Sequence, residues 1–280
     1  MQLNYKKLGN SGSAIIILHG MLGSLDNWQT IAKQFAKDDA SNASQQTSSD
    51  TLHVSNNNDA FNASQHQVYI IDQRNHGRSP HADEMNYEIL AKDIQEFCQQ
   101  HQINKTTIIG HSMGGKVAML LALQHPELIE KLIVVDIAPT YYDGGHESIL
   151  FAMAEAPLKS TEKREDIDNF LAPRIHDFGV RQFIMKNLSR NANGQFEWKC
   201  NFEALILNYR KLMDFPKIET QFLGNTYFIK GEHSNYINQD NFEACDLYFP
   251  NNKIIEIKHA GHWIHADNPT GFLDVIENIL

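Results

Sequence analysis

Residues 105–126 read KTTIIGHSMGGKVAMLLALQHP, and this stretch decides the fold. Its first part is an apolar run typical of a buried strand, and its second part is typical of a helix that ends at Pro126. Between them, residues 110–114 form the pattern Gly-x-Ser-x-Gly. A serine on such a sharp strand-to-helix turn presents its hydroxyl above the sheet, and the glycines let strand and helix approach closely. Ser112 is therefore the predicted nucleophile; the alternative is a glycine-rich turn with an incidental serine.

The rest of the chain alternates the same two kinds of segment. Strand-like apolar runs occur at residues 14–20, 67–77, 129–139, 225–231 and 252–263. Segments with helical spacing occur at residues 27–35, 87–101 and 269–280. This alternation predicts an α/β protein with a mostly parallel central sheet flanked by helices. The motifs follow the C-terminal ends of the strands, which is the edge where ligands bind in open α/β sheets.

Length and composition exclude several classes of function. A chain of 280 residues can bury one large core, so one main domain with an insertion is expected. The net charge of −10 argues against a nucleic-acid partner. The first apolar run has only about five residues, too few for a signal peptide or a membrane span. Cys98, Cys200 and Cys245 lie far apart, so we expect reduced thiols and a cytoplasmic protein without a membrane partner.

Residues 38–66 do not fit the alternation. They are rich in Asn, Ser and Gln and contain little that could be buried. We therefore expect a long polar loop inserted into the core. It is either a tolerated insertion or a segment that recruits a partner protein.

Five motifs, in this order, carry a resemblance to the α/β-hydrolase family, and within it to the small YbfF-like bacterial esterases. They are LHGMLGSLDNW, DQRNHGRSPH, GHSMGGKVAM, VVDIAP and HAGHWIHADNP. The resemblance implies an α/β-hydrolase fold with a small helical cap insertion. The core would be residues 1–140 and 216–280, one discontinuous domain, and the cap residues 141–215, where the resemblance is weakest.

An acyl-transfer enzyme needs backbone N–H groups that stabilise the developing oxyanion. One donor is expected from the residue after the nucleophile, Met113. The family resemblance places the second at Met21, directly after His19 and Gly20 in LHGMLG. The alternative for this loop is an ordinary turn at the end of a strand.

The general base is expected at His262, after the last strand, in the family's chain order of serine, acid and histidine. The usual position of the acid, after Gly231, falls on Ser234, which cannot supply a charge. Glu232 is close in sequence, but the better candidate is Asp136, at the end of KLIVVD. The resemblance implies the same, because the YbfF-like esterases take their acid from this earlier strand. The alternative is that Asp136 caps the loop that leads into the cap.

Three equally spaced histidines, His259, His262 and His265, raise the possibility of a zinc site. Their segment is a strand followed by a loop rather than a helix with one ligand face. We therefore expect no metal, with His259 and His265 as local hydrogen-bonding residues.

Several residues are expected to support the site. The turn at residues 72–79 resembles a brace of the oxyanion loop rather than a phosphate cradle. Lys116 lies four residues after the nucleophile, where it would be a surface charge or a contact to an anionic substrate. The predicted supporting residues are His19, Gly20, Arg74 and His111.

These residues predict a serine carboxylesterase without a cofactor, which cleaves small acyl esters through an acyl-Ser112 intermediate. Thioesters, including acyl-CoA, are a further substrate class implied by the family, and the protein would be a monomer or homodimer. Ser112 excludes the members of this fold that use an aspartate nucleophile. A C–C bond hydrolase or a cofactor-free haloperoxidase of the same fold stays open, because each uses the same triad. A non-catalytic small-ligand-binding member also stays open.

Overall fold

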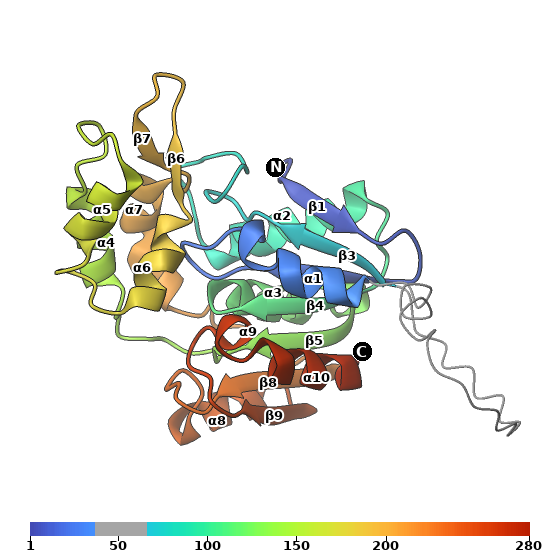
Figure 1. The fold of residues 1–280 in the computed structure, drawn as a ribbon. Helices are drawn as coiled ribbons and strands as arrows, with labels where there is room; N and C mark the ends of the chain where they lie inside the picture. The colour runs from blue at the N-terminus through green and yellow to red at the C-terminus, as the bar shows by residue number, and fades with distance from the viewer. Residues whose placement is uncertain (37–65) are drawn as a thin grey trace, which may run out of the picture.

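The computed structural model describes residues 1–36 and 66–280, so the predicted polar loop lies outside the described residues except for His66. Among the described residues, seven strands form the main sheet in the order β1-β3-β2-β4-β5-β8-β9 (Figure 1). They are β1 Tyr5–Leu8, β2 Ser13–Leu18, β3 His66–Ile71, β4 Thr106–His111, β5 Ile129–Val135, β8 Asn225–Gly231 and β9 Asn252–Ile257. Every neighbouring pair is parallel except β1 and β3. The predicted α/β class with a mostly parallel sheet is confirmed.

The apolar strands of this sheet are buried on both faces. In β2, Ile16 and Leu18 belong to one buried cluster, whereas Ile15 and Ile17 belong to the other. Because side chains alternate along a strand, a strand that is covered on both faces must be apolar at every position. This requirement explains why the run AIIIL is continuous rather than alternating.

Helices cover both faces (Figure 1). On one face lie α1 Gln29–Phe35 and α10 Pro269–Ile279, which the short α9 Ile264–Asp267 precedes. On the other lie α2 Tyr87–Gln100, α3 Met113–Gln124 and α8 Gln239–Tyr248. Short 3-10 helices span Leu25–Asn27 and Pro126–Leu128. The described residues contain no helix that is both long enough and apolar enough to cross a membrane.

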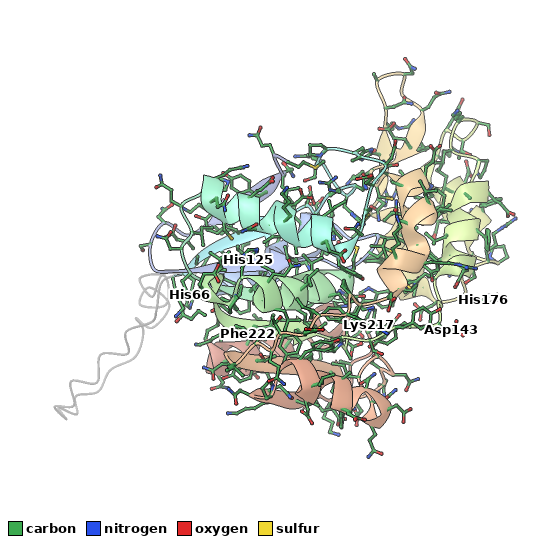
Figure 2. The ribbon with its side chains drawn as sticks, turned by 180° about the vertical axis from the view of Figure 1, so that it is seen from behind. His66, His125, Asp143, His176, Lys217 and Phe222 are labelled. Carbon is green, nitrogen blue, oxygen red and sulfur yellow. The ribbon has the colours of Figure 1, made fainter. Side chains whose placement is uncertain are left out.

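The predicted cap, residues 141–215, is a group of elements next to the sheet (Figure 1). It contains α4 Glu147–Glu155, α5 Arg164–Leu171, α6 Phe178–Met185 and α7 Phe202–Met213. An antiparallel pair, β6 Leu188–Arg190 and β7 Phe196–Trp198, also belongs to it. In Figure 2, Asp143 and His176 lie on the cap side of the molecule, and His125, which follows α3, lies on the other.

Sequence reasoning missed three features of this fold. The first is the pair of short strands in the cap, where no strong strand is expected: β6 and β7 have three residues each, too few to produce a recognisable period in the sequence. The second is the edge strand β1, whose sequence YKKL is half polar. The third is α8, although Asn238 caps this helix by accepting a hydrogen bond from the N–H of Asp240.

Candidate active site

Ser112 lies on a strained turn between β4 and α3. Its backbone has φ 52° and ψ −120°, a conformation that residues with side chains rarely adopt. A Cβ on Gly110 would lie 2.3 Å from the carbonyl oxygen of Gly114, and a Cβ on Gly114 would lie 2.5 Å from that of Leu18. Only glycine fits at these two positions, as the close approach of strand and helix requires.

The loop after β2 runs beside this turn. A Cβ on Gly20 would lie 3.2 Å from the Cβ of Ser112 and 2.9 Å from Nδ1 of His111. Met21 and Met113 line the same cavity as Ser112. Met113 is the first residue of α3, where backbone N–H groups have no partner within the helix. The structure thus brings both predicted oxyanion residues next to the nucleophile, and their role stays a prediction.

The turn after β3 holds this loop through side-chain hydrogen bonds. The N–H of Leu22 donates to Nε2 of His76 at 3.2 Å, and the N–H of Gln73 donates to Nε2 of His19 at 3.0 Å. Nδ1 of His19 therefore carries the proton and donates it to the carbonyl of Gly20 at 2.8 Å. Burial lowers the pKa of His19 to about 4 and that of His76 to about 3. Both rings are neutral at physiological pH.

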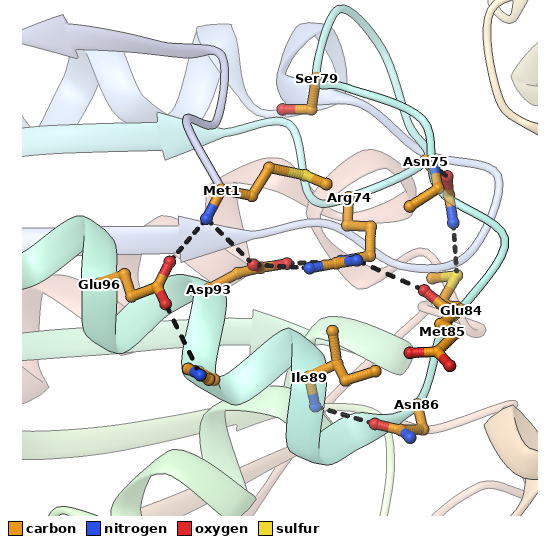
Figure 3. A network of polar contacts seen from close by, with 12 residues as sticks. Met1, Arg74, Asn75, Ser79, Glu84, Met85, Asn86, Ile89, Asp93 and Glu96 are labelled. Atoms are coloured by element: carbon orange, nitrogen blue, oxygen red, sulfur yellow. Dashed lines mark hydrogen bonds and ion pairs between the residues drawn. The ribbon is translucent and has the colours of Figure 1, made fainter.

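Arg74 corrects part of one expectation: its backbone carbonyl supports the oxyanion loop by accepting a hydrogen bond from Nδ1 of His76 at 2.9 Å, but its side chain is directed to α2. Its guanidinium donates to both carboxylate oxygens of Asp93 on α2, at 2.8 and 2.9 Å (Figure 3). The amino group of Met1 lies 3.7 Å from the same carboxylate. Arg74 ties the turn to α2, and the hydrogen bonds to the oxyanion loop come from Gln73 and His76 instead.

Asp136 follows β5 and is completely buried. Its φ of 54° lies in the left-handed region, which aspartate tolerates better than most residues. Oδ2 accepts hydrogen bonds from Nδ1 of His262, at 2.8 Å, and from the hydroxyl of Ser234. Oδ1 accepts one from the N–H of Gly231 at 3.1 Å. These donors compensate the buried charge and aim the carboxylate at the imidazole.

His262 is held by two further contacts. The ring of Tyr236 stacks on it, with 4.0 Å between centroids and 23° between planes. Nε2 of His111 donates to the backbone carbonyl of His262 at 2.8 Å. Burial lowers the pKa of His111 well below 6.5, so a neutral ring makes this contact. Because Nδ1–H of His262 is bonded to Asp136, Nε2 is the nitrogen that can take up a proton.

Glu232, the competing acid, is turned away from His262. Its carboxylate accepts the backbone N–H of His259 at 2.8 Å and pairs with Lys258 at 3.2 Å. These hydrogen bonds and the positive charge of Lys258 lower the pKa of Glu232.

The three equally spaced histidines diverge. The side chain of His259 is exposed and lies beside Glu232 and His233. The potential metal-ligand atoms of these three residues lie within 4.8 Å of one another. The ring of His265 is instead buried and stacks on Trp28, with 4.1 Å between centroids. The expected local hydrogen bonding of His265 is thus replaced by aromatic packing.

Two cavities meet at Ser112. The first is lined by Met21, Tyr87, Ser112, Met113, Lys116, Ile137, Tyr142, His146, Leu212, Met213 and Tyr236. The second is lined by Gly20, Met21, Leu22, His111, Ser112, His146, Ile149, Val180, Phe183, Ile184, His262 and Trp263. Met21, Ser112 and His146 line both. Each cavity therefore has direct access to the nucleophile, one beside Met113 and the other beside His262.

A sequence profile described as the alpha/beta hydrolase fold matches residues 13–178. This span covers more than half of the chain and includes the nucleophile turn. The chain belongs to the α/β-hydrolase family. The predicted fold family is confirmed.

Individual relatives in this family are named as esterases and lipases. The chain is 34% identical over 275 residues to the sn-1-specific diacylglycerol lipase ABHD11 of Xenopus laevis, covering 96% of this chain and 80% of the relative. It is 30% identical over 272 residues to esterase YbfF of Escherichia coli, covering 97% and 94%. A solved structure named marine microorganism esterase is 36% identical, with a TM-score of 0.87 and coverage of 100% and 99%. The predicted resemblance to YbfF-like esterases and the predicted enzyme class, an ester hydrolase, are confirmed.

Lys116 corrects a second expectation, because it is buried rather than on the surface. Its Nζ donates to the backbone carbonyls of Thr140, Met213 and Asp214 at 2.8–2.9 Å. These residues lie where the chain enters and leaves the predicted cap. Burial lowers the pKa of Lys116 to about 7, which the charge of Asp214 partly opposes. Lys116 therefore joins both cap connections to the helix after the nucleophile.

Sequence reasoning missed three residues that contact the predicted site. Ser234 was noted only as a position that lacks the acid, although its hydroxyl donates to that acid. Tyr236 and His146 gave no sequence signal, because neither belongs to a motif. Their roles depend on how the loop after β8 and the start of α4 fold towards Ser112.

Proposed function

We propose that the chain is a serine carboxylesterase that cleaves small acyl esters through an acyl-Ser112 intermediate. One observation carries the proposal: Nδ1–H of His262 donates to the buried Asp136 at 2.8 Å, beside the strained turn that carries Ser112. An acid that orients a histidine next to a serine on a strand-to-helix turn is the arrangement needed for acyl transfer.

In the first half-reaction, Nε2 of His262 takes the hydroxyl proton of Ser112 as Oγ bonds to the ester carbonyl carbon. The charge that develops on the carbonyl oxygen is stabilised by the N–H groups of Met21 and Met113, each worth about 3–4 kcal/mol. Asp136 stays ionised and stabilises the imidazolium of His262. The tetrahedral intermediate then breaks its bond to the alcohol oxygen, which receives the proton from His262.

In the second half-reaction, His262 removes a proton from water, and the resulting hydroxide equivalent attacks the acyl carbon. The proton returns to Oγ of Ser112 as the acid product leaves. The products are one carboxylic acid and one alcohol, and the enzyme is restored without a cofactor.

The two cavities hold different parts of the ester, one the alcohol and the other the acyl group. The proton donor His262 lines only the second cavity, so the leaving alcohol belongs there, because the proton must reach its oxygen. The acyl group then occupies the first cavity, beside Met113.

The same proton transfers would cleave a thioester, so thioesters are the next substrates to test.

The three cysteines are buried, and burial raises the pKa of each thiol to about 12. Unpaired thiols support the proposed cytoplasmic location. Division into a core of residues 1–140 and 216–280 and a cap of residues 141–215 is part of the proposal, as is a monomeric or homodimeric state.

The test is the initial rate of hydrolysis of p-nitrophenyl esters from acetyl to palmitoyl, with Ser112→Ala as the blank. We expect turnover that is highest for short acyl chains and lost in Ser112→Ala. Absence of turnover above this blank at every chain length, from a folded protein, would reject the esterase proposal. A C–C bond hydrolase or a ligand-binding protein would then be the next hypothesis.

Covalent labelling identifies the serine involved. A fluorophosphonate should add its mass to the peptide that contains Ser112, and Ser234→Ala should still be labelled. Labelling that disappears in Ser234→Ala but persists in Ser112→Ala would show that the nucleophile has been assigned to the wrong serine.

A further inference from the structure

His146 lies where the two cavities meet. It directly precedes α4 and lines both cavities together with Ser112 and Met21. Its backbone N–H donates to the hydroxyl of Tyr209 at 3.1 Å. This contact ties the residue to α7, so its ring is held beside the nucleophile.

The contacts of the His146 ring show which of its nitrogens is occupied. Nε2 lies 3.4 Å from the hydroxyl of Tyr236. This hydroxyl can donate to a bare ring nitrogen or accept from a protonated one, so the contact occupies Nε2 in either tautomer of the ring. Nδ1 is the ring nitrogen that is left for another partner.

Nδ1 of His146 is a polar atom without a partner. It is shielded from solvent and makes no hydrogen bond within the described part of the chain. Four other buried side-chain atoms share this property, in Trp28, Gln73, Asn187 and His265, but these residues line neither cavity. A buried polar atom without a hydrogen-bond partner is destabilising, so a substrate hydroxyl beside Ser112, which can donate or accept, would be bound preferentially.

We propose that Nδ1 of His146 forms a hydrogen bond with a hydroxyl on the alcohol part of the substrate, and so selects esters of diols and polyols over plain alkyl esters. This inference rests on the proposed esterase function and adds a substrate class to it. The alcohol part is favoured because His146 and the proton donor His262 together line the cavity assigned to the alcohol.

The contact is made by an uncharged ring. Burial, with a contribution from His262, lowers the pKa of His146 to about 4. Above pH 5 the imidazole is therefore neutral, and it suits a hydroxyl rather than a carboxylate.

The test compares 2-hydroxyethyl butyrate with propyl butyrate, which have the same acyl group and alcohol parts of equal length. We expect the wild-type ratio of kcat/KM for the two esters to favour the hydroxyethyl ester. His146→Phe, which keeps an aromatic ring without the ring nitrogens, should lower this ratio about threefold to tenfold. His146→Asn, which can place an amide group near the position of Nδ1, should restore part of it. Tyr209→Phe is the matched control, because loosening the backbone of residue 146 should affect both esters equally.

Two results would overturn the inference. One is an unchanged ratio in both His146 variants, confirmed as folded by circular dichroism. The other is a selective loss in His146→Phe on propyl 2-hydroxybutyrate, which carries its hydroxyl on the acyl part. Failure of the esterase proposal looks different, because the wild type would then hydrolyse neither butyrate ester.

Discussion

The ends of β5 and β8 are neighbouring positions at one edge of the sheet, but they have different chemistry. The two strands pair in parallel, and Val135 lies opposite Ile229. Beyond β5, Asp136 turns into the left-handed region and directs a buried carboxylate at His262. Beyond β8, Glu232 turns outward, and Ser234 donates a hydrogen bond to the carboxylate of Asp136.

The difference shows that both loops contribute to the orientation of His262, one with a carboxylate and the other with hydrogen-bond donors to it. A single carboxylate is needed to orient His262, and two close carboxylates would repel each other or share a proton. The loop after β8 instead supplies two donors, the N–H of Gly231 and the hydroxyl of Ser234. The loop after β8, whose own Glu232 is directed outward, therefore positions the acid supplied by the neighbouring loop.

The largest effect is expected from Asp136→Asn. The variant loses the charge that stabilises the imidazolium and favours the wrong tautomer of His262, so kcat should fall up to ~10⁴-fold. The measurement is kcat for p-nitrophenyl butyrate, with circular dichroism to show near-native folding. A comparable loss in Glu232→Gln, with Asp136→Asn nearly unaffected, would reverse the assignment of the acid.

The double variant Asp136→Asn/Ser234→Asp moves the acid from the loop after β5 to the loop after β8, and so tests whether either loop can carry it. The hydroxyl of Ser234 and Nδ1 of His262 contact the same oxygen of Asp136, so a carboxylate at residue 234 should come close to the imidazole. We expect kcat to recover by roughly 10- to 100-fold relative to Asp136→Asn. Asp136→Asn/Ser234→Asn is the matched uncharged control. Equal rates in the two double variants would mean that the loop after β8 cannot aim an acid.

Ser234→Ala should have a smaller effect. It removes one hydrogen bond to a buried carboxylate, an interaction worth about 1.5–3 kcal/mol. We expect kcat to fall roughly tenfold because Asp136 is aimed less well, and Ser234→Thr should keep most of the activity. If Ser234→Ala lowers only the melting temperature and leaves kcat unchanged, the hydroxyl stabilises the fold without positioning the acid.

Glu232→Gln should have the smallest effect. The carboxylate of Glu232 bonds to the N–H of His259 and to exposed Lys258, and the amide oxygen of glutamine can still accept the first hydrogen bond. Steady-state kinetics should change by less than about twofold, since a surface ion pair contributes little. A larger change would show that the outer side of the loop after β8 also controls the acid.

Sequence patterns were sufficient for the features that depend on neighbouring residues. The strand AIIIL must be apolar at each position because both of its faces are buried. The turn at Ser112 needs glycine at 110 and 114 because any Cβ there would meet backbone atoms. Such requirements are visible as residue types at fixed spacing. They predicted the fold class, which is confirmed, and the nucleophile, which stays a prediction.

The remaining assignments depended on atoms that are far apart in the chain. The family resemblance, rather than any local pattern, indicated Asp136, whose contact with His262 spans 126 positions. Lys116 is predicted to be a surface charge or a contact to an anionic substrate, but in the structure its Nζ is bonded to both cap connections. Arg74 lies in the predicted brace, but its side chain is bonded to Asp93 on α2. The sequence alone determined which residues carry reactive groups, because covalent chemistry and backbone sterics act locally. Only the tertiary structure decided which of those groups meet, because hydrogen bonding and burial act through space between segments that the fold brings together.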